Sequence, residues 1–170
     1  MKFLVLALCV IAATSTSAWV TLTADEVAVV KSTWDHVKHN EIDILTAVFK
    51  AHPDIQAKFP AFVGKDLNAI KGSAAFAQHA TRIVSFLSSY VGLLGHEENQ
   101  AAIKTLLNEM GHNHVNRGVS KAQFTEFQAS LVAYMKAHVS WGANVEHAWG
   151  DAFDKMNFVL FANLEGHAIH

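Results

Sequence analysis

Apolar side chains recur along most of this chain at intervals of three and four residues, the spacing that places them on one face of an α-helix. In the first such stripe, Val27, Val30, Trp34 and Val37 follow one another at this spacing. Further stripes run through 42–49, 76–90, 103–110, 124–135 and 145–160. No segment alternates apolar and polar residues as a half-buried strand would. The pattern therefore predicts a single all-α domain of six to eight helices.

Capping residues mark the start of several of these helices. Thr23 followed by Glu26, and Ser120 followed by Gln123, have the spacing of a capping box, in which two side chains satisfy orphan amides at a helix start. Ser73 precedes the stripe at 76–90 and can cap its first turn. We therefore expect helices to begin just after these three residues.

Proline and glycine predict the helix ends. Pro53 is expected to stop one helix and open a short next one. Gly92 and Gly95 are expected to end the long helix, and Gly111 to break the one that follows. The residues in 91–99, which include both of the first two glycines, predict an exposed loop.

The amino terminus has the pattern of a secretory signal peptide. Lys2 precedes an apolar run, 3–13, and small residues lead to Ala18. Eleven apolar residues span roughly 16 Å as a helix, too short for a hydrocarbon core of about 30 Å. We expect cleavage after Ala18, which separates a signal peptide at 1–18 from a domain at 19–170. An uncleaved buried helix is the alternative.

Composition narrows the class of protein. Of the 170 residues, 51% are hydrophobic, which excludes intrinsic disorder. Thirteen basic residues against fifteen acidic ones exclude the basic footprint of a nucleic-acid binder. The single cysteine, Cys9, lies in the expected signal peptide, so the processed chain would form no disulfide. Histidine, with eleven residues, is unusually frequent.

Two histidines on helical patterns are candidates for metal binding. No phosphate-binding glycine loop or HExxH motif is present. His79 lies among apolar residues of the long helix, and His114 follows the predicted break in the next one. A neutral imidazole binds iron well, although either residue could equally be a buried core histidine. His112 and His114 cannot chelate from one helix face, because residues two apart point about 200° away from each other.

An ordered set of residues resembles the globin family over nearly the whole of the processed chain. It consists of Trp34 on the first helix, Pro53 at the short third one, Phe59 at the corner, His79 twenty residues later and the segment 114–119. Within the globins, the chain resembles most the secreted haemoglobins of midge larvae. That closer resemblance is carried by 59–67, 79–84 and 134–138.

The resemblance implies a globin fold around a pocket for haem b, with a role for each site residue. His114 matches the proximal iron ligand, and its second ring nitrogen is expected to donate to the carbonyl of Met110. His79 matches the distal histidine beside bound dioxygen, and Ile83 would wall the same side of the pocket. Phe59 matches the aromatic residue that packs flat on the porphyrin.

The resemblance leaves the role of Arg82 open, and the spacing of the two histidines departs from that of most globins. Arg82 fits the pocket mouth, where it could pair with a haem propionate; a solvated charge is the alternative. The two histidines are thirty-five residues apart, a few more than globins usually show, and we expect the surplus in the loop at 91–99. Asn113 stands where many globins have a serine.

Other pocket and surface residues follow from the same comparison. Further candidates for the pocket lining are Phe76, Phe86, Ile103, Leu107, Val119 and Phe124. Most of the other histidines are expected to face solvent, namely His36, His39, His52, His96, His112, His147, His167 and His170. His138 ends an inward-facing run, which predicts burial or a subunit contact.

The resemblance favours a secreted, extracellular oxygen carrier or store, in haemolymph, that is not an enzyme. A haem enzyme or scavenger acting on nitric oxide or peroxide is the alternative, although 170 residues hold no flavin domain to supply electrons. A helical carrier of lipid without haem is a third class. We expect dioxygen as ligand, no nucleic acid, no membrane after processing, and a monomer or noncovalent homodimer.

Overall fold

The computed structural model describes residues 19–170, so the predicted signal peptide lies outside the described residues. Within this range the chain forms eight α-helices, one 3-10 helix and no strand, which confirms the predicted all-α class. The elements are α1 (Ala24–Val37), α2 (Glu41–Ala51), α3 (Pro53–Gln56), α4 (Leu67–Ile70), α5 (Ala74–Leu93), η1 (Glu97–Asn99), α6 (Gln100–Val115), α7 (Lys121–His138) and α8 (Ala143–Leu164).

The predicted caps are present at the helix starts. Thr23 and Glu26 form a complete capping box on α1, and Ser120 and Gln123 form another on α7. The hydroxyl of Ser73 accepts from a first-turn amide of α5, and Pro53 occupies the first turn of α3. Local sequence therefore determines where these four helices begin.

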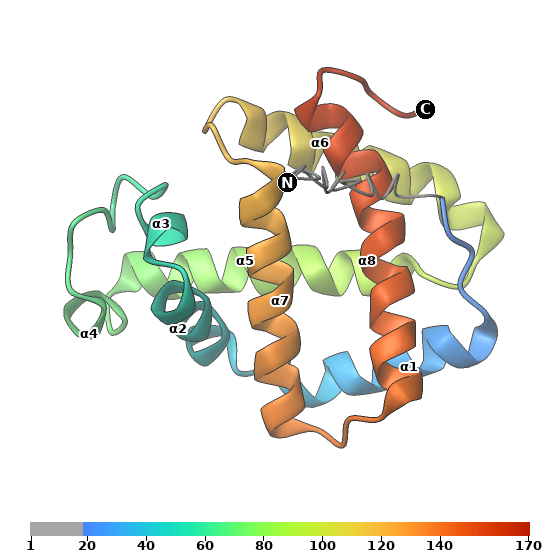
Figure 1. Cartoon of the computed structure of the whole chain (residues 1–170), viewed down its shortest axis with the longest axis horizontal. Coiled ribbons are helices and arrows are strands. Elements are labelled where there is room, and N and C mark those ends of the chain that lie inside the picture. Colours follow the sequence, from blue (N-terminus) through green and yellow to red (C-terminus); the bar gives the residue numbers. More distant parts are fainter. Residues whose placement is uncertain (1–18) are drawn as a thin grey trace, which may run out of the picture.

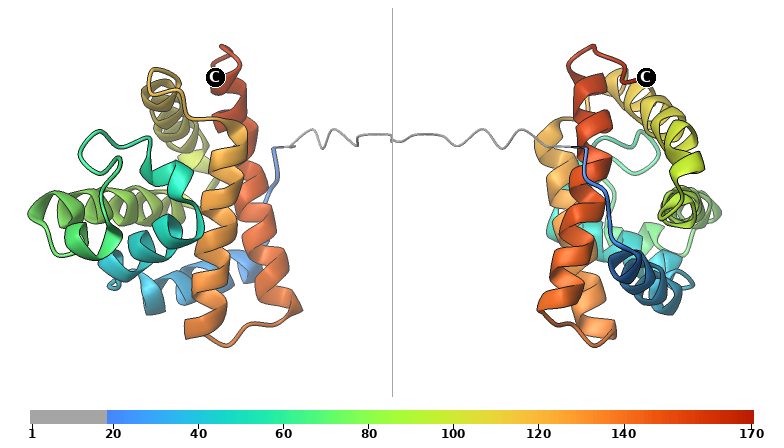
Figure 2. Two further views of the ribbon diagram at one scale, coloured as in Figure 1. Left: turned by 60° about the vertical axis from the view of Figure 1, so that its left-hand side comes forward. Right: turned by 90° about the vertical axis from the view of Figure 1, so that its right-hand side faces the viewer.

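Two long antiparallel helices, α7 and α8, stand side by side, and α5 crosses behind them (Figure 1). Helix α1 crosses one end of the pair and α6 the other, while α2, α3 and α4 lie on the α7 side (Figures 1 and 2). Helix α8 packs against both α1 and α6, and α2 packs against α5 and α7. The helices thus cross at steep angles around a shared interior.

The interior contains two clusters of buried apolar side chains. The larger cluster joins α1, α5, α6, α7 and α8, and includes Trp34 in edge contact with Trp149 at a centroid distance of 6.4 Å. The smaller cluster lies among α2 to α5 and centres on Phe49 and Phe76. One buried polar pair links the helices of the larger cluster: Trp149 Nε1 donates to the Thr33 hydroxyl at 2.8 Å. Among residues 19–170, no helix combines the length and apolarity that crossing a bilayer requires.

One predicted helix break is wrong, because tertiary packing outweighs the local cost of glycine. Helix α6 runs through Gly111 without a break, and His114 lies inside its last turn. A Cβ at Gly111 would overlap Asn163 of α8, so glycine at this position lets the two helices approach closely. Helix α5 ends at Leu93, between the two glycines that were predicted to end it.

The connection between α5 and α6 is shorter than the predicted loop. It comprises Leu94 to His96 and the 3-10 helix η1, and it turns at Gly95, whose φ is +95°. Val91 and Leu94 are buried rather than exposed, because both belong to the larger apolar cluster. The connection brings α6 back against α8. The carboxyl end of α6, with Met110 and His114, then faces the interior of the bundle.

Candidate haem site

A cavity opens between the last turn of α6, the middle of α5 and the facing sides of α7 and α8. The empty space between these helices measures about 790 Å³, a volume that includes open solvent at the mouth of the cavity. Its lining is mostly apolar and comprises Ile55, Lys58, Phe59, His79, Ile83, Phe86, Leu87, Met110, His114, Val119, Gln123, Phe124, Phe127, Gln128, Phe153, Met156 and Leu160.

His114 enters the cavity from α6 with its ring held by the helix backbone. Its Nδ1 lies 2.8 Å from the carbonyl oxygen of Met110, one turn earlier, as predicted from the sequence. Because a carbonyl can only accept, Nδ1 carries the proton and donates it. The other ring nitrogen, Nε2, is then an unprotonated donor atom suited to a metal. The ring edge also contacts Phe124, with centroids 5.2 Å apart.

His79 enters the cavity from α5 and is held by aromatic contacts. Its ring lies in edge contact with Phe59, at a centroid distance of 4.4 Å, and more distantly with Phe62. The pKa of His79 is lowered to about 4, chiefly by burial and to a smaller extent by the positive charges of Arg82 and Arg117. His79 is therefore neutral at pH 7 and keeps one ring nitrogen as a donor.

Burial also lowers the pKa of His114 below its ordinary value. The positive charge of Arg117 acts in the same direction, whereas the hydrogen bond to Met110 opposes the shift. Two neutral imidazoles therefore line one apolar cavity. Neither imidazole has a carboxylate among its hydrogen-bond partners in residues 19–170.

Of the five site residues predicted from the sequence, four line the cavity. These are His114, His79, Phe59 and Ile83. Arg82 is exposed and does not line the cavity, although its positive charge, three residues after His79 on α5, contributes to lowering the pKa of His79.

The further lining candidates divide evenly. Phe86, Val119 and Phe124 line the cavity, whereas Phe76 belongs to the smaller apolar cluster, and Ile103 and Leu107 belong to the larger one. Sequence reasoning missed the contribution of α8, which is Phe153, Met156 and Leu160. Their spacing was a visible signal of a buried helix face, but a buried face looks the same in sequence whether it packs on side chains or lines a cavity.

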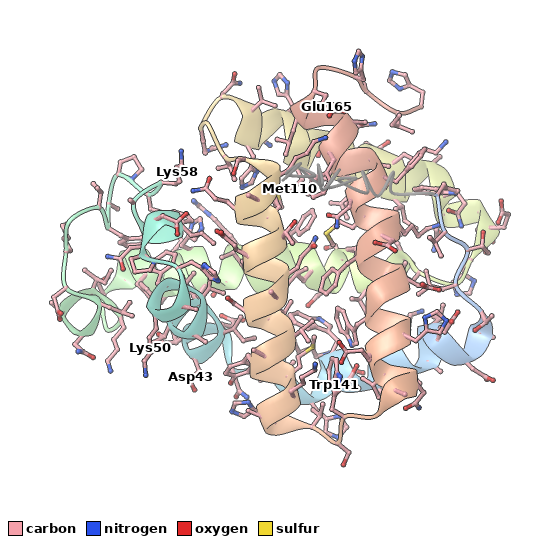
Figure 3. The ribbon with its side chains drawn as sticks, in the orientation of Figure 1. Asp43, Lys50, Lys58, Met110, Trp141 and Glu165 are labelled. Atoms are coloured by element: carbon pink, nitrogen blue, oxygen red, sulfur yellow. The ribbon has the colours of Figure 1, made fainter. Side chains whose placement is uncertain are left out.

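Besides the two histidines, three polar residues line the cavity: Lys58, Gln123 and Gln128. Lys58 Nζ donates to the carbonyl of Gly118 at 2.7 Å, which ties the segment after α3 to the corner between α6 and α7. Figure 3 labels Lys58 near α3 and Met110 on α6, on opposite sides of the start of α7 in that view. Gln128 is buried and exchanges two hydrogen bonds with Asn157 of α8, at 2.8 and 3.1 Å.

Most of the other histidines lie at the surface, as predicted. His52 is half-buried. His138 is exposed, so of its two predicted roles burial is wrong and a subunit contact stays a prediction. The ring of His138 stacks on Tyr134 at a centroid distance of 4.0 Å, and its Nδ1 lies 2.7 Å from the Tyr134 carbonyl oxygen. Both contacts lie within α7, so His138 packs along its own helix.

The cavity defines the class of protein: a helical protein with an apolar, largely closed site and two neutral histidines presented from different helices. Such a lining fits haem, because its apolar walls suit the porphyrin and the fixed tautomer of His114 suits iron. The Globin family model matches residues 42–160. The chain is also 55% identical to Globin CTT-VIIB-7 of Chironomus thummi piger over 163 residues, which are 96% of this chain and 98% of that protein. The chain belongs to the globin family.

Further relatives and solved structures agree with this assignment. Globin CTT-X of Chironomus thummi thummi is 56% identical over 86% of this chain and 97% of its own length. The crystal structure of a haemoglobin component, TA-VII, from Tokunagayusurika akamusi superposes with a TM-score of 0.85 at 44% identity, covering 87% of this chain and 99% of that one. A Drosophila melanogaster globin superposes with a TM-score of 0.77 at 25% identity, covering 87% and 100%.

Proposed function

We propose that this globin is a secreted carrier or store that binds dioxygen reversibly at haem b, with His114 as the iron ligand. The cofactor of the family is haem, which when bound supplies a ferrous iron with an open coordination position for dioxygen. The observation that carries the proposal is the pair of neutral histidines, His114 and His79, in one apolar cavity.

The two histidines have different tasks in this proposal. His114 would hold the iron through Nε2, because its Nδ1 proton is engaged by the Met110 carbonyl. His79, kept neutral by burial, would donate an N–H to dioxygen and so favour it over nonpolar ligands. Phe59 and Ile83, which line the same cavity, would pack against the porphyrin and limit the space beside His79.

The pocket mouth carries positive charge that suits the haem propionates. Arg82 is our candidate for a propionate partner, supported by its electrostatic effect on His79, while a solvated charge is the alternative. Lys58, which sequence reasoning did not single out, lines the cavity and is a second candidate.

Oxygen binding and dissociation measured on wild type and His79→Leu test this proposal. Loss of one hydrogen bond to a ligand that carries partial charge, about 1.5–3 kcal/mol, predicts a roughly 10- to 150-fold faster release of dioxygen from the variant. His96→Leu, at an exposed position on the connection between α5 and α6, is the matched control and should release dioxygen like wild type. If His79→Leu released dioxygen at the wild-type rate, His79 would not be the residue that donates a hydrogen bond to dioxygen.

A haem enzyme or scavenger acting on nitric oxide or peroxide is the second candidate. The names of the relatives, which are globins and haemoglobins, support carriage rather than turnover. Slow autoxidation with full recovery of dioxygen on removal of the gas agrees with a carrier. Rapid autoxidation together with sustained catalytic consumption of nitric oxide or peroxide would overturn it.

Export is the part of the proposal that depends on residues 1–18. The charge, apolar run and small residues of this segment support cleavage after Ala18 and release into the extracellular fluid, haemolymph by resemblance to midge haemoglobins. Amino-terminal sequencing of protein from the medium of insect cells expressing the chain should begin at Trp19. Retention inside the cells with Met1 intact would contradict export.

The processed globin is proposed to work as a monomer or a noncovalent homodimer, without nucleic-acid or membrane partners. Residues 19–170 contain no cysteine, which excludes a disulfide-linked dimer. Sedimentation velocity over a concentration series separates monomer from dimer, and a species resistant to denaturant without reductant would contradict a noncovalent assembly.

A further inference from the structure

A histidine and two carboxylates converge outside the haem cavity, where α2, α3 and α7 meet. His52 lies between α2 and α3, Asp54 in the first turn of α3, and Glu126 on α7. One potential ligand atom from each residue lies within 4.8 Å of the other two. His52 Nδ1 lies 3.7 Å from Glu126 Oε2.

Glu126 Oε2 is the unusual atom of this cluster. This oxygen is shielded from solvent and accepts no hydrogen bond from the described chain, while the Glu126 side chain as a whole is 39% exposed. A shielded carboxylate oxygen without a donor is uncommon in native structures. The ring nitrogen of His52 faces it, at a distance too long for a hydrogen bond and close to the spacing of two ligands on one metal ion.

The third ligand is oriented by a residue of the haem cavity wall. Gln123 Nε2 donates to Asp54 Oδ2 at 2.9 Å, and a carboxylate so held keeps its second oxygen for coordination. In a tetrahedral zinc site with bonds near 2.1 Å, ligand atoms are roughly 3.4 Å apart. The spacing in this cluster needs only side-chain adjustments of about an ångström or less.

We propose that His52, Asp54 and Glu126 form a binding site for a divalent transition metal such as Zn²⁺. One imidazole nitrogen and two carboxylate oxygens are a ligand set that Zn²⁺ accepts, with water as the fourth ligand. The site is independent of haem and of the proposed oxygen binding.

A second cluster of the same composition provides the control. Glu26, His147 and Asp151 also place ligand atoms within 4.8 Å of one another. There, however, Glu26 Oε2 already accepts from the amide and hydroxyl of Thr23, at 2.7 and 2.8 Å. The shortest contacts of His147 to the two carboxylates use different ring nitrogens, Nε2 to Glu26 at 3.5 Å and Nδ1 to Asp151 at 3.7 Å, and its side chain is 70% exposed.

Isothermal titration of the purified protein with Zn²⁺ tests the proposal. Wild type should bind one Zn²⁺ at this site. Changing even an outer contact of a metal site weakens affinity by about 10- to 100-fold, so loss of a direct ligand in Glu126→Gln or His52→Gln should cost at least that much. His147→Gln should keep the affinity of wild type.

Circular dichroism and thermal unfolding show that each variant is folded, and Asp54→Asn supplies a third independent removal of a ligand. Absence of Zn²⁺ binding in wild type would overturn the proposal. Equal affinity in wild type, Glu126→Gln and His52→Gln, or a loss seen only in His147→Gln, would also overturn it.

Discussion

At the scale of single residues, the two cavity histidines differ in what fixes them. His114 is held by a backbone hydrogen bond to Met110, whereas His79 is held by the edge contact with Phe59. The first contact was predictable, because an imidazole four residues after a carbonyl on one helix faces it. The second was not, because Phe59 and His79 lie in different elements and only the tertiary fold brings them together.

The depressed pKa of His79 predicts how stability responds to acid in the haem-free chain. Because the pKa falls from 6.5 in the unfolded state to about 4 in the fold, the unfolded state binds more protons between these values. The free energy of unfolding should therefore decrease as pH falls from about 6.5 to 4. Urea titrations at a series of pH values should show a smaller decrease for His79→Leu than for wild type. Parallel curves for the two proteins would contradict a buried, neutral His79.

At the scale of helices, sequence reasoning succeeded at helix starts and failed at Gly111. Starts depend on side chains within three residues, such as Ser120 and Gln123, which a sequence displays directly. Helix continuation through Gly111 depends on packing against α8 that local propensity does not describe. The same limit explains why Phe153 of α8 was not recognised as lining the cavity.

Gly111 is expected to control how closely α6, the helix of His114, packs on α8. A Cβ added there would overlap Asn163 and lie 3.4 Å from the carbonyl oxygen of Leu160. Gly111→Ala should therefore lower the free energy of unfolding by about 1–3 kcal/mol, as overpacking does.

Gly92→Ala is the matched control for that substitution. Gly92 is also helical, but a Cβ there meets nothing within 4 Å. Alanine should stabilise the helix at this position by about 0.5–1 kcal/mol. Denaturant unfolding of both variants gives the comparison, and a stabilising Gly111→Ala would disprove the close approach of α6 and α8.

At the scale of the whole molecule, an apolar cavity separates helices that the domain must hold together without a disulfide. A ligand that binds only the folded state stabilises it in proportion to the logarithm of its concentration over its Kd. Haem should therefore raise the unfolding temperature of the haem-free chain. Metal-free protoporphyrin IX, which offers His114 no iron, should raise it less. Equal shifts with the two porphyrins would contradict iron ligation by His114.

The most direct test of the central claim is the absorption spectrum of the reduced, purified protein before and after addition of carbon monoxide. A haem held by His114 with its other position open predicts a five-coordinate ferrous spectrum that carbon monoxide converts completely. His114→Ala should lose this spectrum, while His112→Ala, at an exposed position on the same helix, should keep it. A protein that takes up no haem, or a six-coordinate spectrum that carbon monoxide leaves unchanged, would contradict the account.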